Sequence, residues 1–325
     1  MSFSILSINI RGQTKLTIQK QLQIQDMLKY YQCDIMHLQE TDVDDDTFQS
    51  CSFIMNNFTV ISNNSSTGYG TTSLVKNDLE VDNIKLDTSG RIIVFDIQNT
   101  THVNVYLEAG TDSSSRSARE NYINETLPNL LINRCGAGYI TGDWNCISDV
   151  KDATHHPISK LSKSLQRLKR VFELSDSHRL LYPNARDFSH YYTSGDIHGA
   201  TRIDRQYVWG NVTVKSSKYL PIAFSDHCGL LTCLSTPLCL TRHDIPPVPR
   251  NFKIRNEVAE DSIFHRQVST ALIDWLKIRE EGLDTLTWWE LVIKPGIRSI
   301  AIERSKELNQ EHRGTLNLLL IKQAY

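Results

Sequence analysis

The sequence lacks the features of a membrane or secreted protein. It contains no apolar run close to the roughly 20 residues that a membrane-spanning helix needs. The first residues, MSFSILSINIRG, have no basic segment followed by an apolar one, so we expect no secretory signal. The seven cysteines are odd in number and no pair has C-x-x-C spacing, which predicts free thiols in a reducing compartment.

A large excess of one charge is also absent, although charge is uneven along the chain. The net charge is −2 over 325 residues, which excludes a histone-like polycation, and the hydrophobic fraction of 40% argues against wholesale disorder. Residues 151–218 contain twelve Lys and Arg against six Asp and Glu. We interpret this basic stretch either as a face that holds a nucleic-acid backbone or as the solvated surface of ordinary helices.

Segments typical of strands alternate with segments of helical periodicity over residues 1–235, which predicts an α/β domain. The expected strands are 3–9, 33–40, 71–75, 91–97, 102–107, 138–141, 205–214 and 229–234, and the expected helices are 17–31, 117–133 and 160–175. Four of the nine prolines lie in residues 236–250, which predicts a linker, because proline ends helices and does not fit a central strand. Residues 251–325 have helical periodicity and predict a helical extension.

Short polar motifs lie at the ends of several expected strands. They contribute Asn9, Glu40, then Asp143 and Asn145 from GDWN, Asp204 from RID, and Ser225, Asp226 and His227 from SDH. Each motif alone is a weak signal, because a strand-end carboxylate is usually solvated and GDWN is compatible with an ordinary turn. Polar side chains at the ends of rigid strands are, as a set, the usual way in which an α/β fold builds a site.

The motifs SINIRG, LQET, NVY, GDWN, RIDRQYVW and SDHCG, in this order, resemble the endonuclease/exonuclease/phosphatase superfamily. That superfamily includes deoxyribonuclease I, the apurinic repair endonucleases and the endonuclease domains of LINE retrotransposons. The resemblance covers about residues 1–235. It implies a four-layer α/β sandwich, in which two packed β-sheets are flanked by helices, here with a C-terminal helical extension.

Hydrolysis of a phosphodiester requires an oriented water, neutralisation of the phosphate and a divalent ion, and Mg²⁺ prefers one or two carboxylates together with water. Glu40 fits as that carboxylate, Asn9 and Asp226 extend the expected metal site, and Mn²⁺ is a possible substitute for Mg²⁺. The resemblance implies that Asp204 orients a neutral His227 and that Asp143 positions or deprotonates the water. It also implies that Asn145 and Tyr106 donate to the scissile phosphate, that Ser225 supports the site, and that Ser189 supports it or contacts DNA.

Two departures from the family pattern favour the retroelement branch or a degenerate copy. Arg11 stands where the repair nucleases usually have Asp, and Leu107-Glu108-Ala109 replaces the usual Ala-Pro-Asn after NVY. The paired Trp288 and Trp289 and the Arg/Asn-rich entry of residues 251–325 resemble the spacer that precedes reverse transcriptase in LINE polyproteins.

We therefore expect a Mg²⁺-dependent endonuclease that nicks target DNA for retrotransposon integration and leaves a 3′-hydroxyl and a 5′-phosphate. The expected partners are DNA and, in an intact polyprotein, a reverse transcriptase domain absent here, and the expected location is the nucleus. An apurinic-type repair endonuclease, another phosphoesterase of the superfamily, and a degenerate non-catalytic nucleic-acid binder remain open. The sequence sets no oligomeric state.

Overall fold

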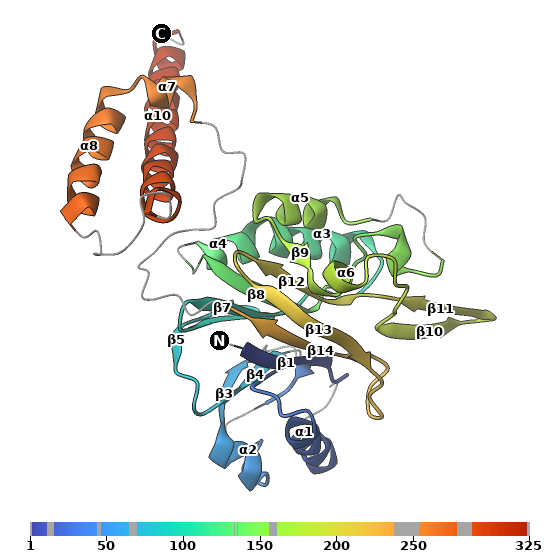
Figure 1. Cartoon of the computed structure of the whole chain (residues 1–325). Coiled ribbons are helices and arrows are strands. Elements are labelled where there is room, and N and C mark those ends of the chain that lie inside the picture. Colours follow the sequence, from blue (N-terminus) through green and yellow to red (C-terminus); the bar gives the residue numbers. More distant parts are fainter. Residues whose placement is uncertain are drawn as a thin grey trace. The chain divides into compact units, whose positions relative to one another are not determined.

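The chain forms two compact units, Met1–Pro247 and Val248–Tyr325, which are described separately (Figure 1). The computed structural model describes residues 2–11, 16–43, 47–64, 70–132, 134, 136–155, 161–236, 254–277 and 288–323. Nearly all of the expected linker, residues 236–250, lies outside these ranges. None of the described helices is both long and apolar enough to cross a membrane.

The first unit contains two six-stranded sheets and a separate two-stranded hairpin. The first sheet has the order β13-β14-β1-β2-β4-β3, and the second has the order β5-β6-β7-β8-β12-β9. The strands of the first sheet are β1 (Ser2–Asn9), β2 (Ile35–Thr41), β3 (Phe58–Asn63), β4 (Gly70–Lys76), β13 (Thr213–Leu220) and β14 (Gly229–Ser235). Those of the second are β5 (Val81–Leu86), β6 (Ile92–Ile97), β7 (Thr100–Tyr106), β8 (Ala137–Asp143), β9 (Ser175–Asp176) and β12 (Asp204–Trp209). The hairpin pairs β10 (His190–Ser194) with β11 (Ile197–Thr201).

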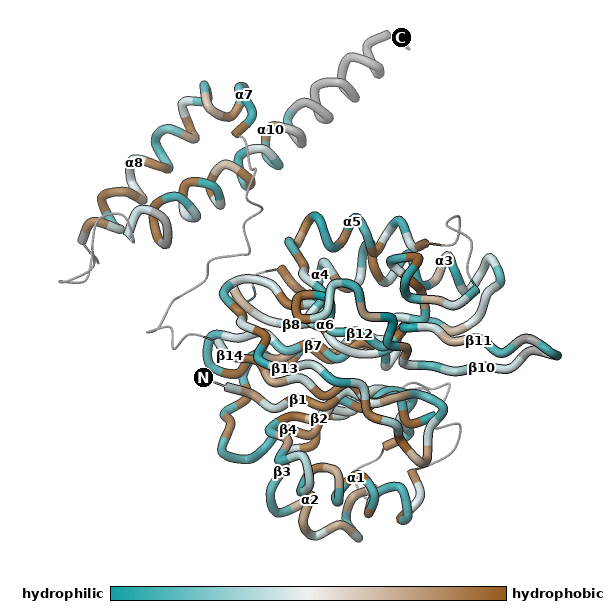
Figure 2. Tube along the Cα trace, turned by 45° about the vertical axis from the view of Figure 1, so that its right-hand side comes forward, coloured by the Kyte–Doolittle hydropathy of each residue, from teal (hydrophilic) through white to brown (hydrophobic). Residues whose placement is uncertain are grey.

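Helices cover the outer face of each sheet, so the prediction of a four-layer sandwich is confirmed (Figure 1). Beside the first sheet lie α1 (Ile18–Tyr30), begun by a Thr17 N-cap, and α2 (Ser52–Asn57). Beside the second lie α3 (Ser113–Asn121), a π-helical turn (Tyr122–Thr126), α4 (Leu127–Leu131), α5 (Lys163–Val171) and α6 (Ser177–Leu181). Figure 2 shows hydrophobic residues in the central strands, which pack against the helices on one face and the opposite sheet on the other.

Two expected elements differ from the structure for local reasons. The expected strand 205–214 is two strands, β12 and β13, that belong to different sheets. Gly210 makes this break with a φ of +68°, and a Cβ there would lie 2.1 Å from the Gly136 carbonyl oxygen. The expected helix 117–133 is continuous in direction but contains the π-helical turn between α3 and α4.

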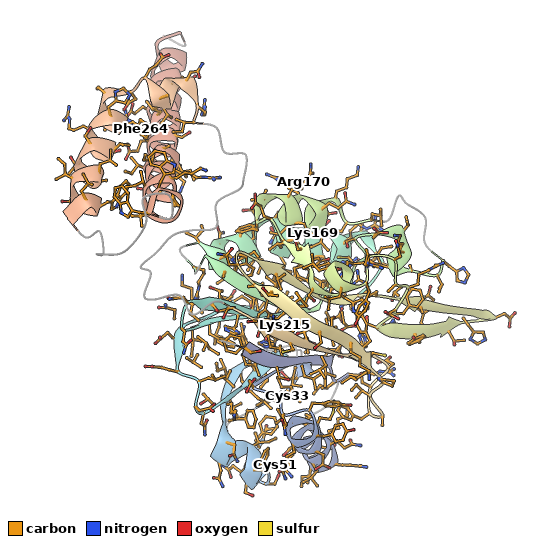
Figure 3. All side chains as sticks on the ribbon, viewed as in Figure 1. Cys33, Cys51, Lys169, Arg170, Lys215 and Phe264 are labelled. Atoms are coloured by element: carbon orange, nitrogen blue, oxygen red, sulfur yellow. The ribbon has the colours of Figure 1, made fainter. Side chains whose placement is uncertain are left out.

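The second unit is helical, as predicted from its periodicity. It contains α7 (Asn256–Ala259), α8 (Ser262–Lys277), a π-helical turn (Trp289–Ile293) and α10 (Lys294–Gln323). Val258, Phe264 and Ala301 form its small core, in which Figure 3 marks Phe264. Trp275 packs on Gly296, where any Cβ would lie within 2.2 Å of the indole ring.

The two sheets meet along a polar seam, which we define as His37 and Gln39 on β2 and Asn104 and Tyr139 on β7 and β8. Gln39 Nε2 donates to Asn104 Oδ1 at 2.7 Å, and Asn104 Nδ2 donates to two carbonyl oxygens of the first sheet. The Tyr139 hydroxyl lies 2.7 Å from His37 Nε2 and 3.0 Å from His102 Nδ1. One hydroxyl therefore serves two buried imidazoles, because it donates its hydrogen to one ring and accepts from the other.

A buried ion cluster holds the start of β12. Arg202 donates to both oxygens of Asp176 at 3.1 and 2.7 Å and to Asp152 at 2.8 Å. Arg205, fully buried, reaches the other oxygen of Asp152 at 3.2 Å. Burial alone would raise the pKa of Asp152, but Arg205 and Arg202 outweigh it and lower the pKa to about 2. The cluster thus fixes the backbone on both sides of Asp204.

Two buried histidines, His37 of the seam and His102 beside Tyr139, predict acid sensitivity. Burial lowers the pKa of His37 to about 3 and lowers that of His102 as well, so both rings are neutral in the folded chain. An unfolded histidine titrates near 6.5, so unfolding takes up protons below that pH and stability falls as the pH falls. We expect each buried ring to lower the free energy of unfolding by about 1.4 kcal/mol as the pH falls from about 7.5 to about 5.5.

Urea unfolding of wild type and His37→Gln at the two pH values measures this cost. The variant should be less stable than wild type at both pH values. Its loss of stability between the two pH values should be smaller by about 1.4 kcal/mol, which is the contribution of one histidine. An identical pH dependence in both proteins would contradict neutral burial of His37.

The ion cluster predicts a large effect of one buried carboxylate. Asp152→Asn leaves two buried guanidinium groups short of a counter-charge, so we expect a loss of about 3–5 kcal/mol in chemical denaturation. Asp149→Asn, the same substitution at an exposed position three residues away, is the matched control. It should cost less than about 0.5 kcal/mol, because Asn can keep the cap contact that Asp149 makes with the Lys151 N–H. Equal small losses in both variants would rule out the role assigned to the cluster.

Candidate active site

The polar residues singled out in the sequence meet at one end of the two sheets. β1 and β2 are parallel neighbours that end at Asn9 and Thr41, and β7 and β8 are parallel neighbours that end at Tyr106 and Asp143. Carboxyl ends of parallel neighbours lie at the same edge, so each sheet delivers a pair of polar side chains there. β12 runs antiparallel to β8 and places Asp204 opposite Asp143.

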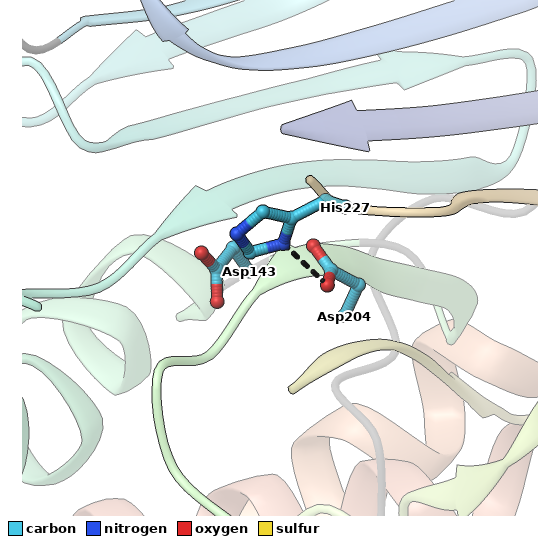
Figure 4. Close-up of side chains that lie close together, drawn as sticks. All are labelled: Asp143, Asp204 and His227. Carbon is cyan, nitrogen blue, oxygen red and sulfur yellow. Dashed lines mark hydrogen bonds and ion pairs between the residues drawn. The ribbon is translucent and has the colours of Figure 1, made fainter. Parts of the chain in front are cut away.

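Asp143, Asp204 and His227 form the tightest group of the site (Figure 4). Each offers one ligand-type atom within 4.8 Å of the others, and all three side chains are buried. His227 Nδ1 lies 2.8 Å from Asp204 Oδ2, and Asp143 lies on the other side of the imidazole ring. Asp204 therefore fixes the orientation of the ring and leaves Nε2 facing Asp143.

Burial and mutual charge shift the titration of this group. Burial, and then the neighbouring Asp204, raise the pKa of Asp143 to about 7. Burial alone would lower the pKa of His227, but Asp204, Asp143 and Asp226 outweigh it and raise the pKa to about 10. The neutral imidazole expected from the sequence remains a prediction, while the three carboxylates around the ring favour its charged form.

A second set of contacts joins the two sheets across the site. Asn9 Nδ2 donates to Glu40 Oε1 and to Asp143 Oδ2, at 3.0 Å each. The Tyr106 hydroxyl donates to the same Glu40 oxygen at 3.1 Å. Asn9 Oδ1 accepts from the N–H of Arg11 at 2.9 Å, which fixes the orientation of the amide. The amide nitrogen of Asn9 therefore points to the two carboxylates and orients them. The metal-ligand role expected for Asn9 remains a prediction.

Asn145 is held beside Asp143 by a tight turn. Its backbone N–H donates to Asp143 Oδ1 at 2.8 Å, and its amide donates to the Leu107 carbonyl at 2.9 Å and to Asp143 Oδ2 at 3.2 Å. Gly142 precedes Asp143 with a φ of +140°, and a Cβ there would lie 1.9 Å from the Val105 carbonyl oxygen. Only glycine therefore lets β8 pass β7 this closely at the site.

Three side chains of the site belong to non-glycine residues in the left-handed region. Arg11, Glu40 and Asn145 have φ values of 49°, 55° and 45°. Such conformations cost of order 1–3 kcal/mol and persist where the surrounding contacts impose them, which is common at functional sites. Four other non-glycine residues of the described chain share this region away from the site, so the conformation alone does not assign Arg11 a role.

The two serines hold the backbone of the site. Ser225 Oγ donates to the Asn9 carbonyl at 2.7 Å and accepts from the His227 N–H at 3.0 Å. Ser189 is fully buried, and its Oγ accepts from the backbone N–H groups of Ile203 and Asp204 at 3.0 Å. Ser189 therefore supports Asp204, and its burial leaves no surface for the DNA contact considered in the sequence analysis.

The donor set fits a hard divalent cation. Among the described residues, Asp204 Oδ1 and Asp226 Oδ1 are buried oxygens without a hydrogen-bond partner. Carboxylate oxygens are the ligands that Mg²⁺ and Mn²⁺ prefer, and a buried unpartnered anion is costly unless a cation compensates it. Asp226, one of the two expected metal carboxylates, therefore has an oxygen chemically suited to that role, and the metal-ligand role expected for Glu40 remains a prediction.

The loop after Tyr106 is supported by contacts that the sequence did not reveal. Arg119 donates to the carbonyls of Glu108 and Gly110 at 2.7 and 2.8 Å, and Arg91 pairs with the Glu108 carboxylate. The Arg91 guanidinium also lies over the Tyr106 ring, 5.0 Å from its centroid. These two arginines hold the loop in the absence of the Ala-Pro-Asn turn of the family pattern.

His190 is a further residue of the site that the sequence analysis missed. Its ring lies 4.7 Å from that of His227, and its Nε2 is 3.9 Å from Asp226 Oδ2. In the sequence, His190 is marked only by its position directly after Ser189. That position was not enough to assign it to the site, because Ser189 itself reaches Asp204 only in the folded chain.

The basic stretch 151–218 is not one surface. Arg202 and Arg205 are buried in the ion cluster, and Arg179 pairs with Asp152 at 3.0 Å, so the expectation that this stretch forms a phosphate-binding face is wrong for these three. Figure 3 shows Lys169 and Arg170 on α5 and Lys215 on β13, which belong to different layers.

Comparisons with known proteins agree with this architecture. Residues 6–227 match the model of the Endonuclease/Exonuclease/phosphatase family. None of the curated proteins searched matches the chain.

Solved structures provide the fold likeness. The AP endonuclease LMAP from Leishmania major is 17% identical with a TM-score of 0.61, over 73% of this chain and 88% of that one. The 3′ phosphatase NExo from Neisseria, bound to a product DNA hairpin, is 19% identical with a TM-score of 0.57, over 71% and 98%. An AP endonuclease from Archaeoglobus fulgidus is 18% identical with a TM-score of 0.58, over 71% and 98%. With its sheets, site and matched residues taken together, the chain belongs to the endonuclease/exonuclease/phosphatase family.

Proposed function

We propose that this chain is a divalent-metal-dependent endonuclease that hydrolyses phosphodiester bonds in DNA and leaves a 3′-hydroxyl and a 5′-phosphate. The observation that carries the proposal is the buried arrangement of Asp143, His227 and Asp204 beside Glu40. It combines a carboxylate that titrates near neutral pH with a fixed cation, which is what attack of water on a phosphodiester requires.

Each residue has a role that follows from its contacts. Asp143 takes a proton from the attacking water, since its raised pKa brings it close to neutral pH. His227, charged and oriented by Asp204, donates from Nε2 to a phosphate oxygen and stabilises the negative charge that develops there. A bound Mg²⁺ or Mn²⁺ ion would supply further neutralisation of the phosphate.

Asn145 and Tyr106 are the expected phosphate donors, but each is committed elsewhere in the free chain. The Asn145 amide donates to Leu107 and Asp143, and the Tyr106 hydroxyl donates to Glu40. Substrate binding would therefore have to exchange these contacts for contacts to phosphate, which is common for catalytic groups in free enzymes.

The retroelement role is the finer part of the proposal. It is supported by the sequence motifs, by Arg11 in place of the usual Asp, and by the helical second unit that follows the nuclease. On this interpretation the chain nicks chromosomal DNA in the nucleus. The 3′-hydroxyl then primes DNA synthesis by a reverse transcriptase domain of the same polyprotein.

Substitution of the central group tests the activity. We expect Asp143→Asn and His227→Ala to lower the rate of supercoiled-plasmid nicking by about 100- to 10,000-fold, because each removes a proton-transfer or charge-stabilising group. Asp149→Asn, exposed and three residues before the ion cluster, should nick like wild type. Near-full nicking by both site variants would refute the assignment.

Metal removal and product analysis test the chemistry. EDTA should abolish nicking, and added Mg²⁺ or Mn²⁺ should restore it. The nicked ends should be extended by a DNA polymerase without prior phosphatase treatment, since a 3′-hydroxyl is expected. A preference for abasic over intact DNA would favour a repair-type activity, and turnover of inositol phosphates alone would favour another phosphoesterase.

A further inference from the structure

Arg11 lies at the edge of the site, where the roles assigned above give it no function. Its guanidinium NH1 lies 3.1 Å from Asp226 Oδ2. The two partners differ in exposure, because the Arg11 side chain is 62% exposed and that of Asp226 is 33% exposed. A guanidinium has five N–H donors in a rigid fork, so the contact of one nitrogen with Asp226 leaves further donors on this exposed side chain.

The backbone around Arg11 is built to hold it there. Its N–H donates to Asn9 Oδ1, and the Lys20 ammonium donates to the carbonyls of Ile10 and Arg11 at 2.8 and 3.3 Å. These contacts impose the left-handed backbone of Arg11, which ordinary side chains avoid. The two Lys20 contacts and the Asn9 contact therefore hold the backbone that presents the Arg11 side chain to Asp226.

The two oxygens of the Asp226 carboxylate are available to different partners, one to Arg11 and the other to a metal ion. Arg11 contacts Oδ2, while Oδ1 is buried without a hydrogen-bond partner among the described residues. A cation bound to Oδ1 and the guanidinium on Oδ2 would then be two positive charges side by side. Two adjacent positive charges attract an anionic oxygen, and the phosphodiester oxygen of the proposed substrate is such a group.

We propose that Arg11 is a further substrate-binding residue, whose guanidinium, held beside Asp226 in the free chain, binds an oxygen of the phosphodiester that is cut. This inference rests on the proposed function for the identity of the substrate. It assigns to Arg11 the phosphate contact that a planar, permanently charged fork makes best.

The competing explanation is that Arg11 only orients Asp226. The two explanations differ in what happens to metal affinity. If Arg11 binds substrate, Arg11→Ala removes a positive charge next to the metal carboxylate, so Mn²⁺ affinity stays equal or rises. If Arg11 only orients Asp226, the same variant binds Mn²⁺ more weakly, because the carboxylate loses its support.

The experiment uses three variants of the full chain with two binding probes. Arg11→Ala removes the guanidinium, Arg11→Lys keeps the charge without the fork, and Lys76→Ala removes one positive charge at the opposite end of β1 and β2 as a matched control. Mn²⁺ binding is followed by electron paramagnetic resonance. Binding of a short DNA duplex in EDTA is followed over a series of salt concentrations.

Turnover of bis(p-nitrophenyl) phosphate, which has a single phosphate, tests whether the contact is at the site itself. For Arg11→Ala we expect KM for this diester to rise about 10- to 100-fold, with a smaller change in kcat, because a charged hydrogen bond to substrate is lost. For DNA, the slope of log affinity against log salt should fall by about one. Arg11→Lys should lie between Arg11→Ala and wild type, and Lys76→Ala should match wild type in each measurement.

The outcomes separate this inference from the proposed function. An unchanged KM and salt slope in Arg11→Ala, or a loss of Mn²⁺ affinity, would overturn the role of Arg11. A wild-type chain that binds DNA with the expected Arg11 dependence but never nicks it would contradict the endonuclease while leaving the phosphate contact in place. If the wild type nicks DNA while Arg11→Ala keeps the wild-type KM and salt slope, the endonuclease is supported and the phosphate contact of Arg11 is refuted.

Discussion

A single imidazole held between two buried carboxylates is the interaction on which this site depends. Asp143 and Asp204 lie on adjacent strands of one sheet, and His227 reaches them from a loop of the other. Burial, and then the charge of the neighbouring Asp204, raise the pKa of Asp143 towards neutrality. The clustered carboxylate oxygens are also ligands that suit a divalent cation.

The rest of the first unit keeps these three groups in register. Ser189 and the ion cluster of Arg202 with Asp152 and Asp176 fix the backbone that carries Asp204. Ser225 ties the loop of His227 to the end of β1. Because these supports are hydrogen-bonded and largely buried, the site is organised before any substrate arrives, which lowers the cost of stabilising charge during the reaction.

The sequence predicted the residues at strand ends and missed those that act through tertiary contacts. Asp143, Asp204 and His227 were recognisable because polar groups interrupt apolar strands at fixed motifs, and a strand end fixes where its next side chain lies. Arg91, Arg119 and His190 gave no such signal, since their partners are remote in sequence. The basic stretch misled for a related reason, because charge counts do not distinguish an exposed lysine from Arg205, which the fold buries against Asp152. The turn at Gly210 was missed because apolar and β-branched residues continue through it, and only the change of sheet shows the break.

The contacts of the site also close the two sheets together. Asn9 of the first sheet bonds Asp143 of the second, Tyr106 of the second bonds Glu40 of the first, and the polar seam continues from there through Gln39 and Asn104. The side chains of the candidate site are therefore also side chains that fasten the two sheets together. A substitution at Asn9 or Glu40 would loosen the contact between the sheets as well as alter the site.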